Sequence, residues 1–132
     1  MRFVQAKWDK DAREELARVY EHDGLGFMLD VLEDEVNDGT ATLFEAFGTL
    51  NIIKGYVVTR VEEIPGYGKE LVIVAAAMKE KDSVSSFLPW FERYGEQLGC
   101  ESVRMHSTKH GMWRMFEREG YNLQERVYTK VI

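Results

Sequence analysis

An unbroken apolar segment, Leu71 to Ala77, constrains the fold of this 132-residue chain more than any other feature. Its residues do not alternate between apolar and polar, which is typical of a strand that is covered on both faces of a sheet. Even when it is extended to Met78, the segment is much shorter than the roughly 18 residues of a membrane-spanning helix. We therefore expect a sheet with this strand near its centre, inside a single domain over residues 1–132.

The negative charge of the chain lies in its first third. Residues 1–40 hold 11 acidic and 5 basic side chains, whereas residues 41–132 hold 12 of each. The net charge of −6 therefore comes from the first third alone. A surface of this sign disfavours a nucleic-acid partner, because the phosphate backbone needs a basic surface. It suits either solvated helix faces or a site that attracts a cationic amine.

Cysteine content and the start of the chain indicate a compartment. Cys100 is the only cysteine, so the chain offers neither an internal disulfide nor a CxxC pair for zinc, and we expect no metal. The first ten residues lack the apolar centre of a signal peptide. These features favour a cytoplasmic protein without a membrane partner.

Residue spacing along the rest of the chain predicts the order of the other elements. Apolar residues three or four apart predict helices, alternating residues predict strands, and glycines mark turns. The expected strands are 2–6, 41–47, 52–61, 71–78, 102–106 and 121–131, and the expected helices are 12–20, 28–36, 84–98 and 109–119. The helix between the fourth and fifth strands makes a crossover, which places these two strands parallel. The fold class is therefore α/β (α+β), with a mixed, mostly antiparallel sheet flanked by about four helices.

This order of elements and three stretches of the sequence resemble the GCN5-related N-acetyltransferase (GNAT) superfamily. Asn51–Val57 looks like the family's third-strand pattern, in which a Gly follows an apolar pair. Residues 71–99 lie where the family has a strand, a phosphate loop and a long helix, and Phe116–Tyr121 is similar to its closing pattern. The resemblance implies an acyl-CoA N-acyltransferase fold and the transfer of an acetyl group from acetyl-CoA to an amine, on a small molecule or a protein.

The resemblance also implies where acetyl-CoA binds. In the family the fourth and fifth strands diverge, and the amide-rich pantetheine arm pairs with the freed main-chain groups like an added strand. The next helix presents its N-terminal N–H groups to the pyrophosphate. The spacing from Gly99 places Asp82 and Val84 where the family has two glycines, so the phosphate loop is degenerate. The residues implied in binding acetyl-CoA are Val74, Met78, Lys79, Ser83, Val84, Ser85 and Lys109.

Pro89 sets an expectation for the start of the long helix. A proline inside a helix costs about 3 kcal/mol, whereas one in the first turn is tolerated. We therefore expect Ser85 or Ser86 to cap the regular helix, with residues 79–84 as a remodelled loop.

Amine acetylation needs a group that accepts the proton of the attacking amine. The candidates for this role are His106 at the end of the fifth strand, Glu45 on the second and Glu63 near the end of the third. A histidine titrates near neutrality and suits this role, but one at a strand end is more often a hydrogen-bonded or exposed structural residue. Many family members have a Tyr that protonates the departing thiolate, but Phe116 occupies that position here and a phenyl ring cannot donate.

Two classes of function therefore fit the sequence. One is an acetyl-CoA-dependent N-acetyltransferase whose amine acceptor is unknown. The other is a catalytically inactive binding or structural protein, like the small GNAT-like proteins of short-tailed phage virions, and such a protein would be virion-associated. An exposed Trp113 would add a homodimer contact to either class.

Overall fold

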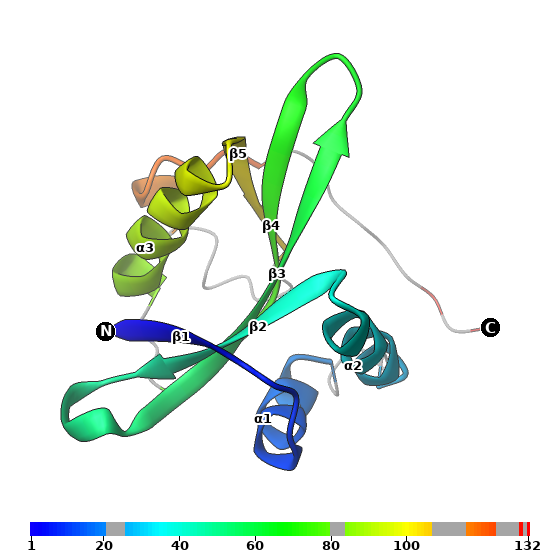
Figure 1. Ribbon diagram of the computed structural model, residues 1–132, viewed down its shortest axis with the longest axis vertical. Coiled ribbons are helices and arrows are strands. Elements are labelled where there is room, and N and C mark those ends of the chain that lie inside the picture. Colours follow the sequence, from blue (N-terminus) through cyan, green and yellow to red (C-terminus); the bar gives the residue numbers. More distant parts are fainter. Residues whose placement is uncertain (21–25, 80–83, 107–115, 124–129, 131) are drawn as a thin grey trace.

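The computed structural model describes residues 1–20, 26–79, 84–106, 116–123, 130 and 132 (Figure 1). One five-stranded sheet runs through it in the order β1-β2-β3-β4-β5. Its strands are β1 (Arg2–Ala6), β2 (Ala41–Phe47), β3 (Ile53–Ile64), β4 (Gly68–Met78) and β5 (Cys100–Met105). Neighbours from β1 to β4 are antiparallel, and β4 and β5 are parallel. The predicted mixed sheet and its crossover are confirmed.

Helices cover both faces of the sheet. They are α1 (Lys10–Tyr20), α2 (Met28–Asp38) and α3 (Val84–Gln97). On one face α1 and α2 bury Leu16 and Leu32 against Tyr56 and Val58 of β3. On the other face α3 packs against the sheet, as Figure 1 shows. The apolar segment forms β4, whose residues Leu71–Ile73 are fully buried. β4 lies between β3 and β5, so it is an interior strand but not the central one, which is β3.

The α3 face is built largely from aromatic rings. Phe3 and Phe44 of the sheet contact Trp90 and Phe91 of α3, with ring centroids 4.9 to 5.6 Å apart. All four pairs are edge-to-face or tilted, arrangements that stabilise beyond the apolar area they bury. This packing fixes α3 over β1 and β2.

The expected serine cap of α3 is wrong, because the helix already begins at Val84 and contains Pro89. Pro89 is the sixth residue of the helix, so its missing N–H removes the bond to the carbonyl of Ser85. Phe87, Leu88 and Phe91 are at most 1% exposed. Their burial offsets the lost bond, since a buried apolar side chain contributes about 1.5 to 3 kcal/mol.

The end of the chain is described only in part. Residues 116–118 are helical, and Gly120 has a φ of 87°, so the predicted stop at Gly120 is confirmed. Most of the predicted helix 109–119, most of the strand 121–131, and Trp113 lie outside the described residues. Within the described part of the chain, no helix is long and apolar enough to cross a membrane.

Candidate active site

β4 and β5 pair over only part of their length. Their parallel register runs from Lys69 opposite Cys100 to Ile73 opposite Met105. β4 continues to Met78, so residues 74–78 have no partner on β5. We call this stretch the open edge of β4. The pairing of β4 and β5 therefore ends partway along β4, as the family resemblance implies.

A bulge at Val74 explains why the pairing ends there. On β3, Thr59 lies opposite Ile73 and Val58 lies opposite Ala75, so Val74 has no opposite residue. An extra residue of this kind bends a strand and increases its twist. Because the bulge follows directly after Ile73, β4 turns away from β5 immediately beyond their last paired residues.

The hydrogen bonds to β3 show which main-chain groups face the open edge. The N–H of Lys79 donates to the carbonyl of Lys54 at 2.8 Å, so Lys79 faces β3. In an antiparallel ladder, alternate residues turn their N–H and C=O groups to opposite sides. Ala77 therefore faces β3 as well, while Ala76 and Met78 present their polar main-chain groups to the open edge.

Gly55 allows the end of β4 to lie close to β3. A Cβ atom at position 55 would lie 2.6 Å from Sδ and 2.9 Å from Cα of Met78, and would also collide with the carbonyl oxygen of Ala77. The glycine of the third-strand pattern is thus required by the close approach of the neighbouring strand. It supports the segment that carries the open edge.

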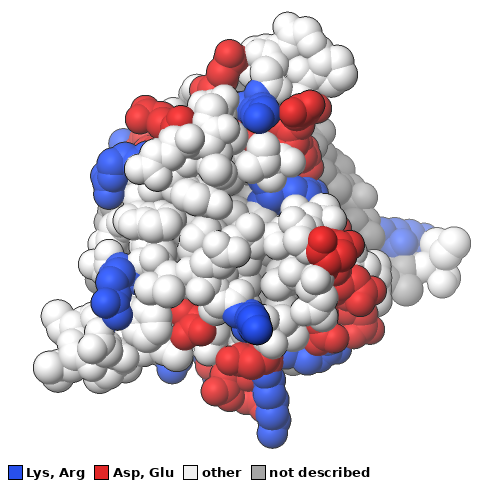
Figure 2. All heavy atoms as spheres, viewed as in Figure 1, with Lys and Arg blue, Asp and Glu red and all other residues white. Residues whose placement is uncertain are grey.

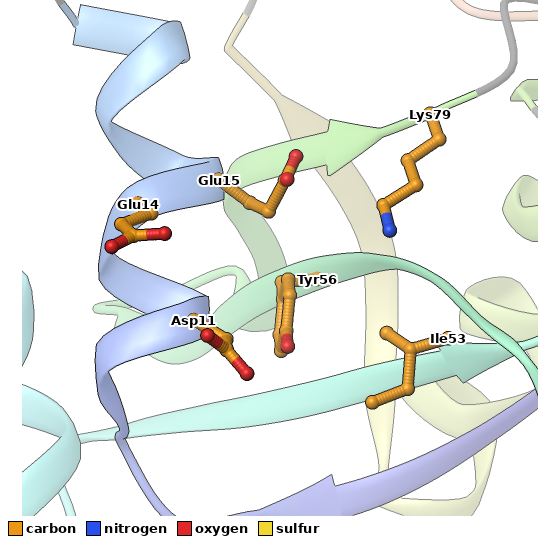
Figure 3. A pocket seen from close by; sticks show the side chains of 6 residues that line it. All are labelled: Asp11, Glu14, Glu15, Ile53, Tyr56 and Lys79. Carbon is orange, nitrogen blue, oxygen red and sulfur yellow. The ribbon is translucent and has the colours of Figure 1, made fainter.

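A pocket lies on the α1 side of the sheet, beside the end of β4. It has a volume of about 220 Å³. Helix α1 supplies three carboxylates, β3 supplies an isoleucine and a tyrosine, and Lys79 follows β4. Its lining residues are Asp11, Glu14, Glu15, Ile53, Tyr56 and Lys79 (Figure 3). We call it the α1 pocket.

Charges in the α1 pocket are only partly paired. Glu14 contacts Lys10 at 3.9 Å and Glu15 contacts Arg18 at 3.4 Å, both within α1. Neither Asp11 nor Lys79 forms an ion pair with another described residue. Figure 3 shows the Lys79 side chain reaching into the pocket from the side opposite α1. The pocket therefore presents an acidic wall and a separate cation.

Tyr56 connects the pocket with the buried core. Its side chain is only 3% exposed, and its hydroxyl forms no hydrogen bond within the described part of the protein. Burial raises the pKa of Tyr56 to about 12, and nearby carboxylates add to the shift. These carboxylates belong to Asp9, Glu45, Asp11 and Glu15. The hydroxyl therefore keeps its proton at neutral pH and can both donate and accept.

The three proton-acceptor candidates lie in different places. Glu45 lies on β2 directly opposite Tyr56, on the sheet face that α1 covers. His106 directly follows β5 and is exposed, where β4 and β5 part. Glu63 is exposed and pairs with Lys69 near the β3–β4 turn, at the opposite end of β3 from Tyr56. The structure thus brings Glu45 to Tyr56 and leaves Glu63 far from both the pocket and the open edge.

The residues implied in acetyl-CoA binding are only partly described. Val74 forms the bulge, Met78 ends β4, and Lys79 follows it in the α1 pocket. Val84 and Ser85 are the first two residues of α3. Ser83 and Lys109 lie outside the described residues. The open end of β4 therefore brings together three of these seven residues.

Sequence reasoning did not single out Tyr56 as a site residue, because an aromatic residue in a strand is most often a core residue. The acidic first third was interpreted as either solvated helix faces or a site for a cationic amine, without naming the residues of the acidic wall. A signal was present in α1, where Asp11, Glu14 and Glu15 are three and four residues apart and so share one helix face. Figure 2 shows that acidic side chains also gather over α1 and α2 more widely.

Three solved structures with the same architecture show how distant in sequence such matches are. A probable acetyltransferase matches with a TM-score of 0.73 and 13% identity, over 100% of this chain and 98% of that one. Ribosomal-protein-alanine N-acetyltransferase from Brucella melitensis biovar Abortus 2308 matches with a TM-score of 0.66 and 10% identity, over 100% of both chains.

A third structure is a predicted acetyltransferase with acetyl-CoA from Clostridium acetobutylicum. It matches with a TM-score of 0.64 and 10% identity, over 98% of this chain and 96% of that one. No family model matches the sequence, and no curated protein does. The mixed sheet, its parallel fourth and fifth strands and these likenesses together show that the chain has the GNAT acetyltransferase fold.

Proposed function

We propose that this protein is an N-acetyltransferase that moves an acetyl group from acetyl-CoA to an amine. The open edge of β4 is the observation that carries this proposal. Ala76 and Met78 offer main-chain N–H and C=O groups there, in the spacing of a strand whose edge has no neighbour among the described residues. A pantetheine arm carries two amides and can pair with such an edge. The described residues therefore fit this part of the co-substrate.

The proposed reaction uses a thioester supplied by acetyl-CoA. The lone pair of the amine nitrogen attacks the carbonyl carbon, the C–S bond breaks, and its electron pair leaves on sulfur. The nitrogen loses one proton to a base, and the thiolate takes up one proton. Because Phe116 packs against the α3 core and has no proton to give, that second proton comes from water.

Glu45 and His106 are the bases that we propose for the first proton transfer. Glu45 lies opposite Tyr56 on the face of the α1 pocket, and His106 lies where the strands part. The pH profile of kcat/KM reports on the base of the free enzyme. The variant that lacks this base, Glu45→Gln or His106→Gln, should lose the limb of the profile that the base produces, whereas the other variant should keep it.

Calorimetric titration with acetyl-CoA tests the proposal directly, followed by release of the CoA thiol in the presence of a panel of amines. Saturable heat with acetyl-CoA and amine-dependent thiol release are expected. No detectable heat at millimolar acetyl-CoA would overturn the assignment.

Phe116 favours a second candidate function, a binding or structural protein with the same fold and no catalysis. This candidate predicts that acetyl-CoA or another ligand binds without any amine-dependent thiol release. Substitution of Tyr for Phe116 separates the two, because a missing proton donor is restored only in a working site. A rise in turnover supports the enzyme, and no turnover in either form supports the scaffold.

A further inference from the structure

The α1 pocket is lined by carboxylates and by a lysine that forms no ion pair with them. Asp11 and Lys79 each lack an ion pair among the residues that the structure describes, although both line a pocket of about 220 Å³. The attraction between a lysine and a carboxylate increases as the two groups approach, and it is greatest in direct contact, within about 4 Å. Here they lie farther apart, so the space between them suits a ligand that bridges both.

Tyr56 gives an independent sign of a ligand. Its hydroxyl lies at the pocket wall and makes no hydrogen bond to another described residue, so it can bind a polar group there. Tyr56 is only 3% exposed, and it lines the same pocket. Figure 3 shows it between the α1 carboxylates and Ile53. A polar ligand in the pocket would supply the partner that the described residues do not.

The size and the lining limit the ligand further. Pockets for drug-sized molecules have volumes of roughly 300 to 1,000 Å³, and this one is smaller. Ile53 provides an apolar contact for a short hydrocarbon segment. The ligand is therefore a small molecule with a short carbon chain between two polar ends.

We propose that the α1 pocket binds a short amino acid-like zwitterion, with its ammonium group at Asp11 and Tyr56 and its carboxylate at Lys79. The ammonium donates to the carboxylate and to the hydroxyl oxygen, and Lys79 donates to the ligand carboxylate. This ligand would be the acetyl acceptor, a role that rests on the proposed function; the binding itself does not. Lys79 directly follows Met78, which places the pocket at the end of the open edge.

Three probes of equal chain length test the proposal by calorimetry without acetyl-CoA. They are 4-aminobutanoate, butylamine and 1,4-diaminobutane, which differ only in the group at the second end. Each charge-assisted hydrogen bond is worth about tenfold in affinity, so 4-aminobutanoate should bind about tenfold more tightly than either amine. Equal or tighter binding of butylamine or 1,4-diaminobutane, or no binding of any probe, would overturn the proposal.

Variants assign the two ends of the ligand. Lys79→Gln should remove the preference for 4-aminobutanoate, whereas Lys69→Gln at the other end of β4 should leave it unchanged. Tyr56→Phe should weaken the binding of all amine probes, and circular dichroism checks that this variant is folded. An unchanged preference in Lys79→Gln would exclude the assigned carboxylate end.

Failure of this inference and failure of the proposed function give different results. If 4-aminobutanoate binds but acetyl-CoA does not, the pocket is confirmed and the acetyltransferase is excluded. If acetyl-CoA is turned over with butylamine as readily as with 4-aminobutanoate, the enzyme is confirmed and the zwitterion is excluded.

Discussion

The backbone N–H of His106 donates to the carbonyl of Ile73 at 3.5 Å. This long bond lies directly beyond the last paired residues of β4 and β5, Ile73 and Met105. The bulge at Val74 follows at once, so three features that end the pairing coincide within two residues of β4. An open edge at this place is therefore a property of the sheet, and it can be tested by substitutions that alter the sheet locally.

Substitution of proline for Ala76 should weaken acetyl-CoA binding without unfolding the protein. The N–H of Ala76 faces the open edge and takes no part in the ladder to β3, so its loss is tolerated as on other strand edges. Loss of one main-chain donor should lower the affinity about tenfold. Ala76→Ser keeps the N–H and is the matched control. Calorimetry measures both, and an unchanged affinity in a folded Ala76→Pro protein would contradict the proposed pairing.

A cluster of charged residues joins β3, β4 and β5 in the region where β4 and β5 are paired. Glu62 on β3 contacts Arg104 on β5 at 2.6 Å and Arg60 at 3.0 Å. Arg104 also contacts Glu70 on β4 at 3.4 Å, so the cluster ties three adjacent strands. These ion pairs lie beside the paired part of β4, so they oppose any further separation of β4 from β5.

Glu62→Gln should therefore destabilise the protein in a pH-dependent way. Burial alone raises the pKa of Glu62, but the hydrogen bonds and charges of Arg104 and Arg60 outweigh it and lower the pKa below its ordinary value. The unfolded protein then binds a proton first as the pH falls, so the stabilising effect is present above about pH 4.5 and is lost below it. Urea unfolding should give a loss of about 1 to 2 kcal/mol at pH 7 that shrinks at acidic pH. A loss that is constant with pH would contradict the ionic role of Glu62.

The order of helices and strands could be predicted because local spacing determines it. In α1, Ala12 and Leu16 are four residues apart and both are fully buried, as their spacing predicts. The bulge at Val74 could not be predicted in this way. It depends on how β4 aligns with Val58 and Thr59 of β3, and Val74 itself lies among apolar residues that all suit a regular strand.

Only the main-chain part of the candidate site was predictable. The family resemblance implied the gap between the fourth and fifth strands, whereas the α1 pocket depends on side chains from α1, β3 and the end of β4. Glu63 and Tyr56 lie on the same strand, and the sequence alone does not show which end of β3 meets the open edge. The register does, because it places Gly55 opposite Met78 and Glu63 opposite Lys69.

Gly55→Ala should destabilise the fold and weaken acetyl-CoA binding together. The new methyl group would collide with the carbonyl of Ala77 and with Met78, whose Cα would lie 2.9 Å away, so β3 and β4 must separate. Overpacking of this kind costs about 1 to 3 kcal/mol. Gly26→Ala is the matched control, because a Cβ there meets nothing within 4 Å. Urea unfolding and calorimetry measure the two effects, and equal stability of both variants would show that the strands are not in close contact.

Tyr121→Phe should leave the protein as stable as before or make it more stable. The Tyr121 hydroxyl is buried and makes no hydrogen bond within the described part of the chain, and its ring lies 6.3 Å from that of Phe116. Burial, and then the charges of Glu92 and Glu119, raise the pKa of this phenol, so the folded state holds its proton longer than the unfolded state does. The free energy of unfolding is therefore unaffected by this titration below about pH 10. At higher pH it decreases, by up to about 1.4 kcal/mol per pH unit. Removing the hydroxyl should add up to about 1 kcal/mol at pH 7, since an unsatisfied buried group is lost, and should make the alkaline decline less steep. Thermal unfolding from pH 7 to 11 measures both, and a loss of stability at pH 7 would show that the hydroxyl has a hydrogen-bond partner after all.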